Sequence, residues 1–223
     1  MRKIFLTIFS ALILTLFLGC DNKTTVTNVE DKPQVMKEEK VKEAPKKKEL
    51  SAEEKALRKL NIADKKKYDL SDVFKDSAKI APNGKYMIII FESPECPYCM
   101  KMENDIFNTK DLKDELKNEF DTYTLDATKN RLHKLEHEGS LMDVDTKTLI
   151  DIYGVTSTPT LIFADKKGKS IFVVPGYMPK EQFLVTLKFV KEQKWLGLDR
   201  KNGDVYKALK NYYIDNGIMK DKK

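Results

Sequence analysis

The chain has 223 residues, of which 41% are hydrophobic and 34% are charged, enough for one compact domain with appended segments. Its formal net charge is +6, which falls to +4 (39 basic against 35 acidic residues) without residues 1–19, where Arg2 and Lys3 lie. This small surplus, with no arginine-rich stripe interleaved with aromatic residues, argues against a nucleic-acid partner.

Residues 1–19 have the pattern of an export signal. Two positive residues precede an apolar run from Ile4 to Leu18, which Gly19 and Cys20 follow. A membrane-spanning helix needs about 20 apolar residues, so this run is short for one. A charged start, a short apolar stretch and a small residue before the processing point are typical of a signal peptide.

The end of this segment resembles a bacterial lipoprotein signal. That resemblance implies that Cys20 is lipidated and becomes the new N-terminus, although Phe17 and Leu18 stand where the family prefers leucine and a small residue. Asp21 resembles a signal for retention in the inner membrane. The alternative is an uncleaved N-terminal anchor with an incidental cysteine, and either reading exports the rest of the chain.

Residues 20–49 are polar and rich in lysine and glutamate, with no apolar periodicity, and this composition predicts a disordered tether. Ser51 and Glu54 have the spacing of a capping box, in which each side chain satisfies a free backbone N–H group. The sequence therefore predicts an N-terminal helix within residues 50–69.

From residue 70 the pattern changes to alternating elements that predict an α/β fold with a central mixed β-sheet flanked by helices, over residues 70–195. Residues 196–223 form a C-terminal extension. The elements expected in chain order are a helix at 70–80, a buried strand at 86–91, helices at 97–107 and 109–119, a strand at 120–126, helices at 130–138 and 146–153, a hairpin of strands at 160–163 and 170–174, a helix from Pro179 to about Trp195, and a helix at 204–213.

Cys96 and Cys99 enclose Pro97 and Tyr98, directly before the helix expected at 97–107. Free N–H groups and the positive dipole end at a helix N-terminus favour a thiolate, and proline suits the first helical position. Cys99 lies about one turn further on the same side, so it can attack a mixed disulfide formed at Cys96. The sequence predicts Cys96 as nucleophile and Cys99 as resolving cysteine, a redox pair that needs no separate cofactor.

A zinc site is the competing interpretation of these cysteines. Zinc usually takes four ligands, and the chain has no second pair of cysteines with this spacing. His133 and His137 lie four residues apart on an expected helix, so a site with two cysteines and two histidines is arithmetically possible. Two exposed helical histidines are the simpler interpretation, and we expect no metal.

Three motifs occur in the order found in thioredoxins: FESPECPYCMKM at 91–102, YGVTSTPT at 153–160 and PGY at 175–177. Together they resemble periplasmic thiol-disulfide oxidoreductases of the thioredoxin fold, including SoxW-like proteins and the catalytic domains of DsbC and DsbG. The resemblance implies that Pro159 is cis and lies against the cysteine pair, with the backbone of Thr158 pairing with substrate. A trans proline that begins a strand is the alternative for Pro159.

The sequence also departs from that family. Thioredoxins carry a buried acid six residues before the first cysteine, where this chain has Ile90. Glu92 is nearby, but strand alternation points it to the face opposite its neighbour, which makes it a weak substitute. The N-terminal region is too polar to resemble the dimerisation domain of the isomerases, so we expect a monomer.

The resemblance implies an extracytoplasmic enzyme that reduces or isomerises disulfides in exported proteins. Its expected partners are the thiols and disulfides of those proteins, a membrane electron donor, and the membrane itself through the lipid anchor. The expected location is the periplasm, on the inner membrane. A disulfide-donating oxidase and a non-catalytic binding or chaperone module of the same fold are the alternatives.

Overall fold

The computed structural model describes residues 68–220. The export signal, the tether, the lipidation of Cys20 and nearly all of the helix expected within residues 50–69 lie outside the described residues. Within residues 68–220, no helix is both long and apolar enough to cross a membrane.

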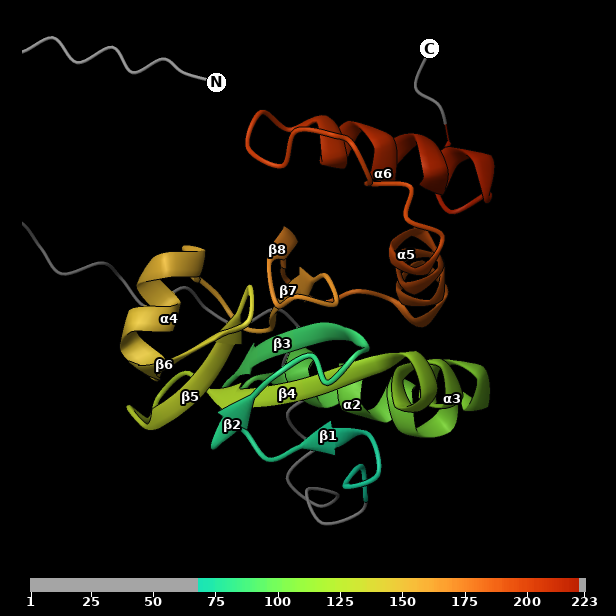
Figure 1. Cartoon of the computed structure of the whole chain (residues 1–223). Coiled ribbons are helices and arrows are strands. Elements are labelled where there is room, and N and C mark those ends of the chain that lie inside the picture. Colours follow the sequence, from blue (N-terminus) through green and yellow to red (C-terminus); the bar gives the residue numbers. More distant parts are fainter. Residues whose placement is uncertain (1–67, 221–223) are drawn as a thin grey trace, which may run out of the picture. The chain divides into compact units, whose positions relative to one another are not determined.

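The main sheet has five strands in the order β1-β4-β3-β7-β8 (Figure 1). The first three in this order run parallel, while β7 is antiparallel to both β3 and β8. The sheet is therefore mixed, as the sequence predicts. The strands are β1 (Phe74–Lys75), β3 (Tyr86–Glu92), β4 (Phe120–Asp126), β7 (Thr160–Ala164) and β8 (Ser170–Pro175).

Strand β3 lies at the centre of this sheet and contacts a separate apolar cluster on each face. Ile88 and Ile90 belong to the cluster that holds the helices α2, α3, α5 and α6. Met87, Ile89 and Phe91 belong to the other, which includes Leu149 of α4. Successive side chains of a strand point to opposite faces, so a continuous apolar run fits a strand covered on both sides.

Five helices are described, and their bounds lie close to the predicted ones except at the end of α5. They are α2 (Pro97–Asn108), α3 (Lys110–Glu119), α4 (Thr146–Tyr153), α5 (Lys180–Lys191) and α6 (Asp204–Asp215). The sequence predicts that this helix ends near Trp195. The helix ends earlier because Gln193 adopts a left-handed conformation (φ 56°) and the Lys194 N–H bonds to the carbonyl of Phe189.

The prediction of a helix at 130–138 is wrong. These residues form β5 (Leu132–His137), which pairs in a small second sheet with β2 (Lys79–Ile80) and β6 (Ser140–Asp145). Glu138 and Gly139 connect β5 to β6, both with positive φ (50° and 80°), as a tight two-residue hairpin turn requires. Leu132 and Leu135 are three residues apart and therefore also matched a helix.

The prediction of a helix at 70–80 is also wrong. This stretch holds only the two-residue strands β1 and β2, joined by turns. The carboxylates of Asp69 and Asp76 accept backbone N–H bonds from Ser71 and Ala78, at 3.0 and 2.9 Å. Such local bonds offer the backbone an alternative to a helix.

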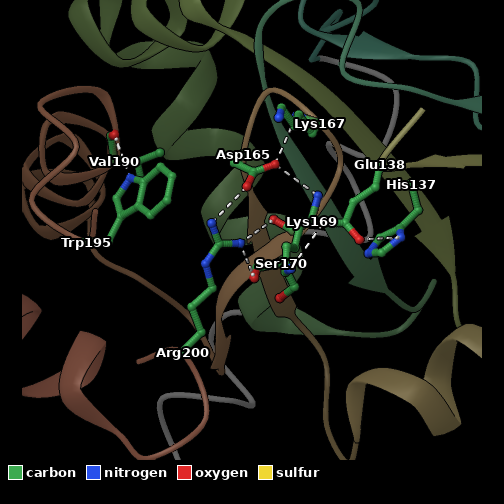
Figure 2. Close-up of polar contacts among 9 residues, drawn as sticks. All are labelled: His137, Glu138, Asp165, Lys167, Lys169, Ser170, Val190, Trp195 and Arg200. Carbon is green, nitrogen blue, oxygen red and sulfur yellow. Dashed lines mark hydrogen bonds and ion pairs between the residues drawn. The ribbon is translucent and has the colours of Figure 1, made fainter. Parts of the chain in front are cut away.

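The C-terminal extension is attached to the hairpin of β7 and β8. Arg200 pairs with Asp165 in the hairpin turn at 2.9 Å and donates to the carbonyl of Ser170 at 3.0 Å (Figure 2). The Arg200 guanidinium lies 4.7 Å from the centre of the Trp195 ring, whose N–H donates to the carbonyl of Val190. An ion pair and hydrogen bonds to backbone carbonyls thus attach the extension to the rest of the domain.

Helix α6 covers the free edge of β8. The Tyr206 hydroxyl bonds to both the N–H and the carbonyl of Val173, at 3.1 and 3.0 Å. Tyr213 is buried and its hydroxyl lies 2.6 Å from that of Thr186 in α5. These tyrosines have packing and edge-capping roles, because an uncovered edge strand can pair with another chain.

Candidate functional site

Cys96 and Cys99 lie at the N-terminus of α2, after the loop that leaves β3. They form a disulfide with a Cα–Cα distance of 5.2 Å. Cys96 occupies the N-cap position, where its sulfur accepts the N–H of Cys99 at 3.1 Å, and Pro97 begins the helix. The N-cap sulfur therefore takes a bond that would stabilise a thiolate there. The side chains of Cys96 and Cys99 are 6% and 2% exposed.

The loop before β7 reaches the same sulfur from the other side. The Thr158–Pro159 peptide bond is cis. The carbonyl oxygen of Thr158 lies 3.3 Å from the Cys96 sulfur, and its hydroxyl lies 3.1 Å from that of Ser93. The structure thus brings together the cysteine pair and the Thr158–Pro159 segment, which are more than 50 residues apart in the sequence.

An aromatic pair lies beside the cysteines. The rings of Tyr98 and Tyr177 have centroids 6.0 Å apart, and the Lys101 ammonium lies 4.8 Å from the Tyr177 ring centre. The Tyr177 hydroxyl donates to Asp105, and burial together with this carboxylate raises the pKa of Tyr177. Tyr177 belongs to the PGY motif, but nothing in the sequence indicated that it pairs with Tyr98.

Acidic side chains lie beside Cys99. Glu92, Glu103 and Asp126 line a cavity of about 300 Å³ together with Cys99. Burial, followed by the charge and hydrogen bond of Glu103 and the charge of Asp126, raises the pKa of Glu92 to about 8, although a hydrogen bond from Thr124 opposes the shift. Raised pKa values of this kind cluster at functional sites.

Glu92, which strand alternation makes a weak substitute for the buried acid of thioredoxins, lines the cavity of Cys99. It lies opposite Phe91, as alternation requires, but it shares a face with Ile90, the position where thioredoxins carry their buried acid. That face belongs to the cluster that includes Met102 and Ile106 of α2. The two-residue spacing from Ile90 was the available signal, because it places Glu92 further along the same face toward the cysteines.

The two histidines lie on β5 rather than on a helix, and neither lines the cavity of Cys99. His133 is 2% exposed on β5, where its Nδ1 donates to the carbonyl of Ser77 at 2.7 Å and its Nε2 lies 2.8 Å from the Thr146 hydroxyl. His137 lines a separate cavity of about 620 Å³ that shares no residue with the cysteine site. In the described part of the chain, no three histidine, cysteine or acidic side chains are grouped to hold a metal ion.

Comparisons with known proteins agree with this geometry. The family model described as a thioredoxin-like domain matches residues 73–191. A thioredoxin-fold protein from Helicobacter pylori is 34% identical, with a TM-score of 0.63, over 70% of this chain and 99% of its own. No curated protein matches the sequence.

Two further solved structures are more distant from this chain. An exposed lipoprotein thioredoxin from Streptococcus pneumoniae is 25% identical over 53% of this chain and 88% of its own, with a TM-score of 0.36. A thioredoxin from Thermus thermophilus is 22% identical over 52% and 88%, with a TM-score of 0.38. The family model matches more than half of the chain, and the fold carries a Cys-X-X-Cys pair. These two findings define the class of protein. The chain belongs to the thioredoxin-like domain family.

The raised pKa of Glu92 predicts a pH dependence of stability. The ordinary pKa is 4.5 and the folded value is about 8, so between them the folded state keeps a proton that the unfolded state releases. The contribution of the Glu92 proton to stability is therefore full below about pH 4.5 and is lost as the pH rises toward 8. We expect the free energy of unfolding of the wild type to fall between about pH 5 and 8. Relative to Glu92→Gln, this loss should be about 1 kcal/mol or more, measured by urea denaturation.

Glu95→Gln is the matched control, because Glu95 is exposed in the neighbouring loop and does not line the cavity. It should keep the wild-type pH dependence. Parallel stability curves for the wild type and Glu92→Gln over this pH range would contradict the assignment of a buried, protonated carboxyl to Glu92.

Proposed function

We propose that this protein is an extracytoplasmic thiol-disulfide oxidoreductase that reduces or isomerises disulfides in exported proteins. The observation that carries the proposal is the position of the Cys96 sulfur. It caps α2 by accepting the N–H of Cys99 and lies 3.3 Å from the Thr158 carbonyl. A sulfur at this position is electrostatically suited to ionise, and the neighbouring loop supplies backbone groups for an extended substrate.

In the reducing direction, the Cys96 thiolate attacks a substrate disulfide and releases one substrate thiolate. Cys99, three residues further on α2, then attacks the Cys96 sulfur, forms the Cys96–Cys99 disulfide and releases the second substrate thiolate. Two electrons pass to the substrate. A donor must then return two electrons to the protein, and we propose a membrane thiol reductant for this step.

Isomerisation uses the same first step. The mixed disulfide at Cys96 is released when another thiol of the substrate attacks it, so the protein ends in its reduced form and no net electrons are transferred. Reduction therefore needs a donor in every turnover, whereas isomerisation needs one only to keep the cysteine pair reduced. An oxidase instead begins from the disulfide form.

Reduction of insulin by the purified full chain with dithiothreitol tests the redox activity. We expect Cys96→Ser to lower the turnover above the uncatalysed rate by about 100-fold or more, because it removes the attacking thiolate. Cys20→Ser is the control and should retain wild-type turnover, since it removes the chain's third cysteine without touching the pair. Equal turnover in the wild type and in Cys96→Ser contradicts the proposal.

The direction is tested by equilibration of the cysteine pair with glutathione. A potential between about −270 and −180 mV, the range between thioredoxin and protein disulfide isomerase, supports reduction or isomerisation. A potential near about −120 mV, as in a strong oxidant, supports the disulfide-donating alternative.

The location is a further part of the proposal. We propose that Cys20 carries lipid and holds a monomeric domain on the periplasmic side of the inner membrane. The charged start, the apolar run and Cys20 in the sequence support it.

Labelling of expressing bacterial cells with a radioactive fatty acid tests the anchor. We expect label in the wild type and none in Cys20→Ser, with Cys96→Ser as the control that keeps the label. Equal labelling of the wild type and Cys20→Ser contradicts lipidation at this position.

A further inference from the structure

The cavity of about 620 Å³ shares no residue with the cysteine site and has no part in the proposed redox chemistry. We call it the apolar groove. It lies between Met142 of β6, Ile152 of α4, Val173 of β8 and Tyr206 of α6. Small-molecule sites typically measure about 300–1,000 Å³ and have mostly apolar walls with a few placed polar groups. The apolar groove has the size and the lining of such a site.

Part of the wall of the apolar groove is open to solvent. Met142 and Ile152 are large apolar side chains, yet they are 44% and 64% exposed. Leu135 of β5 and Leu149 of α4 are buried and continue the apolar wall. A ligand with an aliphatic body that covers Met142 and Ile152 removes apolar surface from water, which favours binding.

The charged side chains of the apolar groove lie at one end of it, beside the turn between β7 and β8 (Figure 2). They are Lys169, Arg200 and Lys201, and none of the described residues that line the groove is acidic. Glu138 pairs with Lys169 at 3.1 Å, and Asp165 pairs with Arg200 at 2.9 Å. The Lys201 ammonium has no ion-pair partner within residues 68–220. This end therefore carries an uncompensated positive charge, which suits an anionic group.

The outer edge of β8 beside the groove offers few backbone groups to a ligand. Arg200 donates to the carbonyls of Lys169 and Ser170, at 3.3 and 3.0 Å. The Tyr206 hydroxyl bonds to both the N–H and the carbonyl of Val173. An extended peptide binds a strand edge through bonds to such backbone groups. Because these groups are occupied, the groove suits a ligand whose body needs no hydrogen bonds.

We propose that the apolar groove binds a linear aliphatic carboxylate, such as a medium-chain fatty acid. The carboxylate pairs with Lys201, and the chain lies along β8 toward Val173, against Met142 and Ile152. From Lys169 to Val173 the strand extends by about 13 Å, at about 3.3 Å per residue, a length that an extended medium-chain acid can fill. This inference does not depend on the proposed redox function.

Calorimetric titration of the full chain with octanoate, decanoate and dodecanoate tests the aliphatic part of the ligand. Each acid is used below the concentration at which it forms micelles, and the chain carries Cys20→Ser so that no lipid on the protein competes. Burial of one methylene group raises the affinity by about fourfold. We therefore expect the affinity to rise by about tenfold or more from each acid to the next. An affinity that does not rise with chain length contradicts the proposal.

Met142→Gln and Leu141→Gln are a matched pair of variants that locate the binding site. Leu141 is the neighbour of Met142 on β6 and is 54% exposed, but it does not line the groove. We expect Met142→Gln to lower the affinity for dodecanoate by at least about fivefold, because an amide pays for its desolvation, and Leu141→Gln to stay within about twofold of the wild type. Equal affinities of the two variants contradict binding in the groove.

The anionic group is tested with dodecyltrimethylammonium, which has the same aliphatic chain and the opposite charge. We expect the wild type to prefer dodecanoate by at least about tenfold at low ionic strength, and Lys201→Gln to lower this preference by about threefold or more. Lys147→Gln is the control, because Lys147 is exposed on α4 and does not line the groove. A wild-type preference in Lys201→Gln contradicts the position given to the carboxylate.

The methyl resonance of Met142 supplies a readout that does not depend on a variant. Addition of dodecanoate should shift it and leave that of Met102, which is buried in the cluster on the other face of the sheet, unchanged. Two other occupants would give different results. Sedimentation with vesicles of phosphatidylethanolamine and phosphatidylglycerol, or dimerisation of the chain, that Met142→Gln weakens while dodecanoate leaves the Met142 resonance unshifted would overturn the inference.

Discussion

The bond from the Cys99 N–H to the Cys96 sulfur is the contact on which the site depends. It fixes Cys96 at the start of α2, where the helix dipole and free N–H groups meet it. For this contact to form, β3 must end beside the helix N-terminus, and it does so because its apolar residues are buried on both faces at the centre of the sheet. The loop with Thr158 and cis-Pro159 closes the site from the opposite side.

The two sulfurs of the disulfide lie in opposite electrostatic environments. Cys96 meets N–H groups and the positive end of a helix, which favour a negative charge on sulfur. Cys99 shares its cavity with the acidic side chains of Glu92, Glu103 and Asp126, and negative charge there disfavours a thiolate. This asymmetry is consistent with the proposed division of steps, in which Cys96 attacks the substrate and Cys99 releases it.

Helices and strands with strong local sequence signals could be predicted, whereas elements that depend on pairing with distant residues could not. The central strand, α2 and the hairpin of β7 and β8 follow from apolar runs, the Cys-Pro start and turn residues. Leu132 and Leu135 within residues 130–138 have helical spacing, and only pairing with β6 across the turn at Gly139 decides for a strand. The raised pKa of Glu92 could not be predicted from the sequence, because it depends on burial and on Glu103, which α2 brings beside it.

The central claim is that the position of Cys96 makes it the more acidic thiol, and ultraviolet thiolate absorbance of the reduced Cys20→Ser chain tests it most directly. Titration with the added changes Cys99→Ala or Cys96→Ala assigns each thiol. The account predicts that the Cys96 pKa lies below the ordinary value of about 8.5 and that Cys99 ionises at higher pH. Ionisation of Cys96 at or above its ordinary pKa, or after Cys99, would contradict it.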